Sequence, residues 1–454
     1  MQFNFKNQGL SIVAALLISP FVVSSAYAVD LMGVHDLAAD SDPGLQAAAY
    51  RRDATGENKR QALANFLPSL NGSAGWTQGD NKTDIDGNRV SKNDVDTDNY
   101  RLDLRQSIYD QGNYEQMDIA RGQLSQAEAI YDFAYQDFLV RVAGRYFAVL
   151  TAQDGVIFAE AEEKALQRQF DQAEQRFKVG LTAVTDVHEA RASWDIARAR
   201  AIVSRNNLAD AKEGLYELTG QYFDEIDPLQ DELPLVKPTP DSTEEWLDIA
   251  MQYNPSVIAA RMGVEIADST VRYERSGHYP TLDLVASLSQ FTNNDFVIRD
   301  DFQNPIANTD MVNNDNRIGL QLTVPIYQGG AVFSRTRQAR YTFNAVTEDL
   351  DQQQRATVRA TNNAYRAVIA GIEQVQAFGQ AKISAESALK ATEAGFEVGT
   401  RTIVDVLIAQ QSYYQAQREN SLARHTYVVD HLRLKAVAGV LATDDLLKVN
   451  NILK

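Results

Sequence analysis

The sequence contains no cysteine in its 454 residues. A chain of this length therefore folds without disulfides, and its stability must come from packing or from assembly with other chains. The absence of cysteine also excludes thiol catalysis and a lipid anchor on a processed N-terminal cysteine.

Long hydrophobic runs are missing after residue 28, so any membrane span in the mature chain must consist of strands. One apolar stretch precedes that point, from Ile12 to Val23, with Lys6 before it and the small-x-small sequence Ala26-Tyr27-Ala28 after it. This pattern predicts a signal peptide over residues 1–28. The stretch is too short to span a bilayer as a helix, so we expect an exported chain that begins at about Val29.

Basic residues are in the minority, with 43 Lys and Arg against 61 Asp and Glu and a net charge of −18. A nucleic-acid partner, which needs clustered basic charge, is therefore not expected. The sequence also lacks a phosphate-binding glycine loop and a nucleophile elbow. None of the five histidines has metal-ligand spacing, so we expect no metal, no cofactor and no enzyme activity; they are His35, His188, His278, His425 and His431.

Proline is absent between Pro68 and Pro228 and again after Pro325. Proline-free stretches rich in Ala, Gln, Glu and Arg predict very long helices, here from Asn113 to Val179 and from Ala331 to Val398. Each would be roughly 100 Å long. Each ends at a glycine and is followed by a second helix, about 183–220 or 402–441, so two long antiparallel helical hairpins are predicted. Their narrow apolar stripes favour coiled-coil packing.

Elsewhere the pattern changes to strict alternation of apolar and polar residues. It is clearest at 318–324, also occurs at 100–104 and 282–288, and is weaker at 70–78. Strands of about ten residues with one apolar face have the length of a tilted transmembrane strand. We expect two strand hairpins, joined by long polar loops at 79–98 and 293–316. Four strands cannot close a barrel, so the chain must oligomerise; two copies would give eight strands and three would give twelve.

One of these loops carries the acidic sequence Asp84-Ile85-Asp86-Gly87, which raises the question of a calcium site. The position that should open an EF-type loop is Lys82, and the closing position is Asn93. A solvated surface loop is therefore the favoured interpretation.

The chain contains two copies of one unit. The segment 177–187 returns as 396–406, and both carry Phe, Val-Gly and Asp-Val at matching places. We expect the signal peptide at 1–28, a first repeat at 29–220, a proline-containing linker at 221–242, a second repeat at 243–441 and a C-terminal tail at 442–454. Shorter helices are expected at 30–65 and 243–278.

The motif Gly399-Thr400-Arg401-Thr402-Ile403-Val404-Asp405-Val406-Leu407, its partner at 180–187 and the duplicated order of elements resemble the TolC family of outer-membrane ducts. The resemblance covers essentially the whole mature chain. It implies an α+β membrane protein: a homotrimer with a twelve-stranded β-barrel, four strands per chain, continuous with a long α-helical coiled-coil tunnel in the periplasm. It also implies contact with outer-membrane lipid, and docking to an inner-membrane pump through a periplasmic adaptor.

A periplasmic gate is the site that this resemblance implies. Spacing alone favours an i,i+4 ion pair between Arg401 and Asp405 on a solvated helix face. In the family the matching arginine holds the entrance shut by binding residues that match Thr185 and Asp186 of a neighbouring hairpin. The sequence departs from the family at Phe396, where a tyrosine is frequent. It departs again at Ile408, where better-known members carry a second acidic residue, so Asp405 alone would supply an acidic ring.

The turns at the hairpin tips are the second candidate site. Val179-Gly180-Leu181 and Val398-Gly399-Thr400 are helix terminators. In the family these tips also meet the adaptor, and we expect the same here.

Two other classes of protein remain as alternatives. A periplasmic coiled-coil adaptor would share the long hairpins but would have no lipid-facing strands, and a trimeric surface adhesin would need a C-terminal anchor. The apolar alternation at 318–324 favours a passive exit duct for an efflux pump or a type I secretion system.

Overall fold

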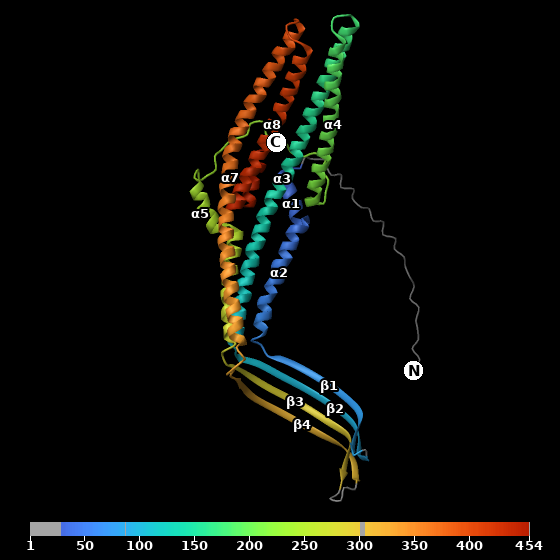
Figure 1. Ribbon diagram of the computed structural model, residues 1–454, viewed down its shortest axis with the longest axis vertical. Helices are drawn as coiled ribbons and strands as arrows, with labels where there is room; N and C mark the ends of the chain where they lie inside the picture. The colour runs from blue at the N-terminus through green and yellow to red at the C-terminus, as the bar shows by residue number, and fades with distance from the viewer. Residues whose placement is uncertain (1–28, 87, 300–304, 454) are drawn as a thin grey trace, which may run out of the picture.

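The structure is a computed structural model that describes residues 29–86, 88–299 and 305–453. The predicted signal peptide at 1–28 lies outside the described residues. The molecule is strongly elongated: a four-stranded sheet lies at one end, and two helical hairpins point away from it at the other (Figure 1).

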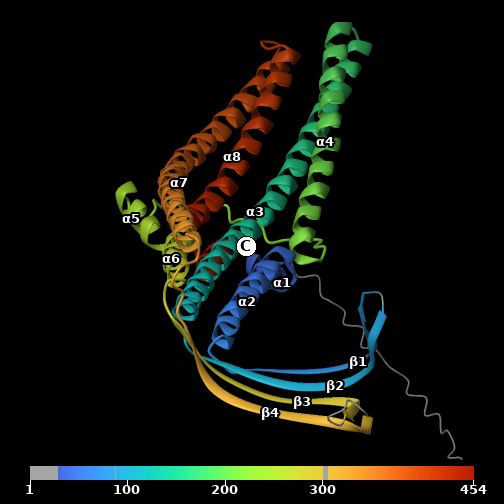
Figure 2. The same ribbon diagram turned by 60° about the horizontal axis from the view of Figure 1, so that its bottom comes forward.

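The sheet combines strands from both repeats. Its strands are β1 (Ser69–Ile85), β2 (Asn88–Tyr109), β3 (Thr281–Arg299) and β4 (Pro305–Thr323), all antiparallel and in the order β1-β2-β3-β4. The β2–β3 pairing joins the two predicted strand hairpins. Figure 2 shows the sheet as a curved layer that starts at the lower ends of the long helices.

The strand register places apolar side chains in one row on one face of the sheet. Leu70 lies opposite Leu104, Leu104 opposite Ala286, and Ala286 opposite Ile318. Leu70 and Ile318 are exposed in the single chain. On the polar face, Arg105 contacts Asp283 of the neighbouring strand at 2.8 Å. One face is thus suited to lipid and the other to water.

The predicted polar loops at 79–98 and 293–316 are wrong. The strands run through most of both segments, to lengths of 17–22 residues. The physical reason is that a backbone hydrogen-bond ladder does not need an apolar face. The apolar alternation marks only the part of each strand that suits lipid, and the ladder continues beyond it.

The predicted helical hairpins are confirmed. They consist of α3 (Gln111–Lys178) with α4 (Val184–Thr219), and α7 (Ala331–Glu397) with α8 (Ile403–Ala438). Asp110 caps the start of α3 by accepting the Gly112 amide at 2.8 Å. Among the described residues, no helix is both long enough and apolar enough to cross a membrane.

The shorter helices expected at 30–65 and 243–278 are confirmed, and each range holds a pair. The first is α1 (Leu31–Ser41) and α2 (Pro43–Ala64), and the second is α5 (Thr243–Tyr253) and α6 (Pro255–Ser276). The break falls at Asp42-Pro43 and at Asn254-Pro255, where the acid or amide caps the next helix and proline starts it. Proline cannot donate to the preceding helix, so the chain must bend there.

The largest core lies at the level where the hairpins meet the shorter helices. Tyr146 of α3 is fully buried, and its hydroxyl donates to the Asp227 carbonyl of the linker at 2.7 Å. The linker also forms isolated bridges, Val29 with Ile226 and Leu229 with Leu453. The tail expected at 442–454 contains a helix, α9 (Thr443–Asn450), which packs against this core. Both repeats, the linker and the tail therefore share one core.

Gly439 ends α8 at a place where no side chain fits. Its φ is +79°, and a Cβ there would lie 2.2 Å from the Tyr253 carbonyl oxygen. We expect Gly439→Ala to cost at least about 2 kcal/mol, because the left-handed conformation and the backbone overlap both oppose it. Thermal unfolding of the purified protein measures this. Gly155→Ala, in α3 where a Cβ would meet no atom within 4 Å, is the control and should leave the stability unchanged or raised.

Candidate functional site at the hairpin tips

The two tips end in matching glycine turns. Gly180 has φ +77° and Gly399 has φ +80°, so both adopt the left-handed conformation that glycine permits. The turns close through the Leu181 amide on the Arg176 carbonyl and the Thr400 amide on the Gly395 carbonyl, each at 2.8 Å.

The tips present apolar side chains to solvent. Val179, Leu181 and Val398 are 69%, 77% and 75% exposed in the chain. Three aliphatic side chains this exposed, on two neighbouring turns, form the kind of surface that a partner protein covers.

Asp405 does not form the predicted ion pair with Arg401. It caps α8 instead: its Oδ2 accepts both the backbone amide and the hydroxyl of Thr402 at 2.9 Å, and its own amide donates to the Thr402 hydroxyl at 3.3 Å. These hydrogen bonds, with the nearby Arg401 charge, hold the pKa of Asp405 below its usual range. The sequence Thr402-x-x-Asp405 has the spacing of a capping box, so the cap is visible in the sequence itself.

Arg401 packs over a residue without a side chain. A Cβ on Gly395 would lie 2.8 Å from the Arg401 Cγ. Among the described residues, Arg401 forms no ion pair within 4 Å, so its guanidinium is free to reach another chain.

Thr185 and Asp186 lie in the first turn of α4, at the other tip. Thr185 is exposed, and Asp186 accepts a hydrogen bond from the Thr182 hydroxyl. Within one chain the structure therefore does not bring Arg401 together with these two residues. They form separate local arrangements, one at each tip.

Phe396 has a partner that the sequence does not indicate. The Arg176 guanidinium carbon lies 4.5 Å from the centre of its ring, a cation–π distance between the ends of α7 and α3. No local sequence pattern could reveal this contact, because the two residues lie on different hairpins.

A buried apolar cluster lies next to this contact and contains residues of α3, α4 and α8. Phe396, Phe170 and Trp194 are partly buried against it. The Trp194 indole stacks on Phe170 at 5.5 Å, yet within the described chain its buried Nε1 has no hydrogen-bond partner. The buried members of the cluster are Leu166, Ala173, Ala190, Ala197, Ile403 and Leu407.

Farther from the tips, α3 and α8 are joined by polar contacts. The Tyr414 hydroxyl donates to the Ala161 carbonyl at 3.2 Å. Glu162, whose side chain is 1% exposed, binds Arg200 of α4 at 3.0 Å and Arg418 of α8 at 2.8 Å. One buried carboxylate therefore ties three helices of both hairpins together.

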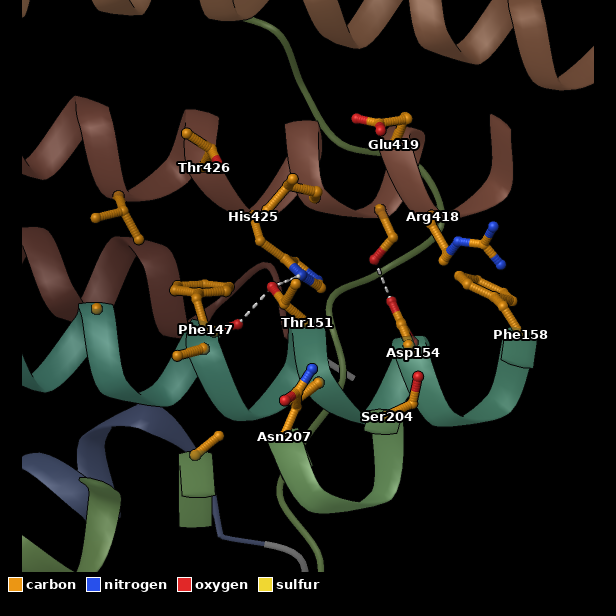
Figure 3. Close-up of a pocket in the computed structure, with 18 of the residues that line it drawn as sticks. Phe147, Thr151, Asp154, Phe158, Ser204, Asn207, Arg418, Glu419, His425 and Thr426 are labelled. Atoms are coloured by element: carbon orange, nitrogen blue, oxygen red, sulfur yellow. Dashed lines mark hydrogen bonds between the residues drawn. The ribbon is translucent and has the colours of Figure 1, made fainter. Parts of the chain in front are cut away.

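The apolar cluster and the contacts of Tyr414 and Glu162 together form the seam between the two hairpins. A cavity of about 700 Å³ continues this seam between α3, α4 and α8 (Figure 3). His425 Nδ1 and the Thr151 hydroxyl are 2.8 Å apart across it, and Ser421 donates to Asp154. Burial lowers the pKa of His425 to about 4, which the Asp154 charge partly opposes. His425 is therefore neutral at physiological pH.

These residues join the two hairpins by non-covalent contacts. The seam holds ion pairs, hydrogen bonds and apolar packing, and the described residues contain no group of three or more His, Cys, Asp or Glu that could hold a metal ion. Such a set of contacts can hold two hairpins together or release them.

With the sheet, the hairpins and the tips described, the molecule has the fold of trimeric outer-membrane channels, in which three chains share one twelve-stranded barrel and a helical tunnel. It is similar to the solved outer-membrane protein VceC of Vibrio cholerae. The TM-score is 0.73 and the identity 19%, over 90% of this chain and 96% of that one.

The sequence matches the family model described as outer membrane efflux protein at residues 34–221 and 246–440. It is 36% identical to the outer membrane protein TolC of Escherichia coli, over 98% of this chain and 89% of that protein. It is also 28% identical to the proteases secretion protein PrtF of Dickeya chrysanthemi, over 94% and 91%. The chain belongs to the outer membrane efflux protein family, and it is an exit duct of the outer membrane. The adaptor alternative, which predicted no lipid-facing strands, is wrong.

Glu162 provides a test of the seam. We expect Glu162→Gln to destabilise the protein by about 1–3 kcal/mol, because two arginines lose a charged acceptor at a buried position. Thermal unfolding measures the change.

Glu160→Gln is the matched control. Glu160 binds Arg205 at 2.8 Å, but both side chains are about half exposed. Such a pair contributes about 0–1 kcal/mol, so an equal loss in the two variants would contradict the role of Glu162 in the seam.

His425 predicts a dependence of stability on pH. Its pKa is lowered from 6.5 to about 4 in the folded chain. The neutral His425 therefore contributes its full stabilisation of the folded chain above pH 6.5. This contribution is lost as the pH falls toward 4, because His425 of the unfolded chain binds a proton at a higher pH than His425 of the folded chain.

We expect the free energy of unfolding to fall by about 2 kcal/mol over that range. Urea unfolding at several pH values measures this change. His425→Gln should flatten the curve. Burial raises the pKa of Asp430, and this shift has the opposite effect on the pH dependence of stability. The difference between the parent protein and His425→Gln is therefore the quantity that reports on His425. His188→Gln, outside the buried core, should keep the original slope.

Proposed function

We propose that the duct is a homotrimer whose periplasmic entrance is closed at the hairpin tips and opens when a partner docks there. The observation that carries this proposal is the placement of Arg401: it lies at a tip, at the far end of the molecule from the lipid-facing sheet, with a guanidinium that the described part of its own chain leaves without an ion pair (Figure 1). An arginine in that position is available to bind another copy.

The acceptors that suit Arg401 are Thr185 and Asp186 of a neighbouring chain. Both lie in the first turn of α4, where Thr185 is exposed. Asp186 binds Thr182 within its own chain but retains a second carboxylate oxygen. An arginine can bind a carboxylate and a hydroxyl together, which would join the tips of neighbouring copies into a closed ring.

The exposed aliphatic tips suit a protein partner. A periplasmic adaptor that buries Val179, Leu181 and Val398 would gain apolar contact area and would also displace the neighbouring Arg401 contacts. Binding that favours the separated arrangement of the tips shifts the entrance toward the open state.

The duct itself performs no chemistry in this proposal. An inner-membrane pump selects the cargo, small molecule or protein, and supplies the energy. The signal peptide at 1–28 directs export and is removed, and the hairpins extend into the periplasm of a Gram-negative cell. Asp405 would add one acidic ring near the entrance, which attracts cations to it.

Arg401→Ser tests the gate. We expect normal trimers with a higher single-channel conductance in planar bilayers, because the hydroxyl cannot replace two charge-assisted hydrogen bonds between copies. Arg359→Ser, an exposed arginine of the same hairpin, should keep the conductance of the parent protein. An Arg401→Ser channel as closed as the parent would refute the gate.

A further inference from the structure

The contact between Arg176 and Phe396 lies at the last turn of both long helices. Arg176 is two residues from the end of α3, and Phe396 is one residue from the end of α7. Their separation of 4.5 Å, from guanidinium carbon to ring centre, is well within cation–π range.

The turns at the tips fix both partners in place. The Arg176 carbonyl accepts the Leu181 amide at 2.8 Å, and the Phe396 carbonyl accepts the Gly399 amide at 3.1 Å. The two side chains thus project from backbone that each glycine turn holds, and a movement of either tip moves one partner of the pair.

The hairpins diverge toward their tips in both views (Figures 1 and 2). At this level the side chain of Arg176 reaches from α3 to α7. Glu174, an acid two residues earlier on α3, is bound by Lys178 at 3.0 Å. Within the described chain Arg176 forms no ion pair within 4 Å, so the face of the Phe396 ring is its charge-stabilising neighbour.

Phe396 also connects this pair to the rest of the entrance. Its ring packs against the buried cluster that contains Ile403 and Leu407. The residue before it, Gly395, lies under the side chain of Arg401. The contact between chains proposed for Arg401 and the contact within the chain at Phe396 therefore share one short segment of α7.

We propose that Arg176 and Phe396 form a latch within each chain, which holds the two hairpins together at the tip and must break before the entrance widens. The proposal rests on the gated duct proposed above.

The test compares single-channel open-to-closed ratios. Phe396→Leu keeps apolar contact with the cluster but removes the ring face, and Arg176→Gln removes the charge. We expect each to raise the ratio about two- to fivefold, the effect of losing an exposed cation–π contact. The double variant should show no further increase, because the second change removes a contact that is already lost. Phe396→Tyr, which keeps the ring, should behave like the parent.

Phe177→Leu is the matched control. Phe177 is the exposed neighbour of Arg176, and this variant makes the same chemical change without touching the latch. Trimer content is checked for every variant so that a folding defect is recognised.

Arg401→Ser is measured in the same series to separate the two proposals. If Arg401→Ser opens the channel while Phe396→Leu and Arg176→Gln do not, the latch is refuted and the gate stands. If the two single changes add in the double variant, the residues act independently and the latch is again refuted. If none of the three changes alters conductance, the gate itself fails.

Discussion

The unpaired edges of β1 and β4 are the constraint on which the rest of the molecule depends. Within lipid every backbone amide and carbonyl needs a hydrogen-bond partner, and a four-stranded sheet leaves two edges without one. A barrel shared between copies supplies these partners, because each edge strand pairs with an edge strand of the next copy. The helices must then continue from a closed ring of strands, so they too are arranged around a common axis, and each hairpin meets hairpins of its own and of neighbouring chains.

The seam between the hairpins combines polar and apolar contacts along its length. Near the core, the buried Glu162 carboxylate joins Arg200 and Arg418, a contact that is costly to break. Nearer the tips lies the apolar cluster, in which the buried Trp194 Nε1 lacks a partner within the described chain. The hairpins are therefore joined by a buried charge network toward the core and by apolar packing toward the tips.

The long hairpins could be predicted because their signals are local. The proline-free stretches and the terminal Gly180 and Gly399 mark the helices within a few residues. Predictions failed where a local signal was ambiguous. The helix breaks at Pro43 and Pro255 were missed, although the preceding Asp42 and Asn254 cap the following helices. The strands were cut short at 79–98 and 293–316, because their outer parts lack the apolar alternation by which lipid-facing strands are recognised.

The sequence by itself determined the duplicated architecture, the class of membrane strand and the position of the tips, since periodicity, proline and glycine act over a few neighbouring residues. The tertiary structure alone decided which residues of the two hairpins meet. Glu162 joins three helices, and Arg176 reaches Phe396 across two hairpins. Such contacts between hairpins depend on the relative placement of helices whose residues are hundreds of positions apart, and local spacing carries no information about that placement.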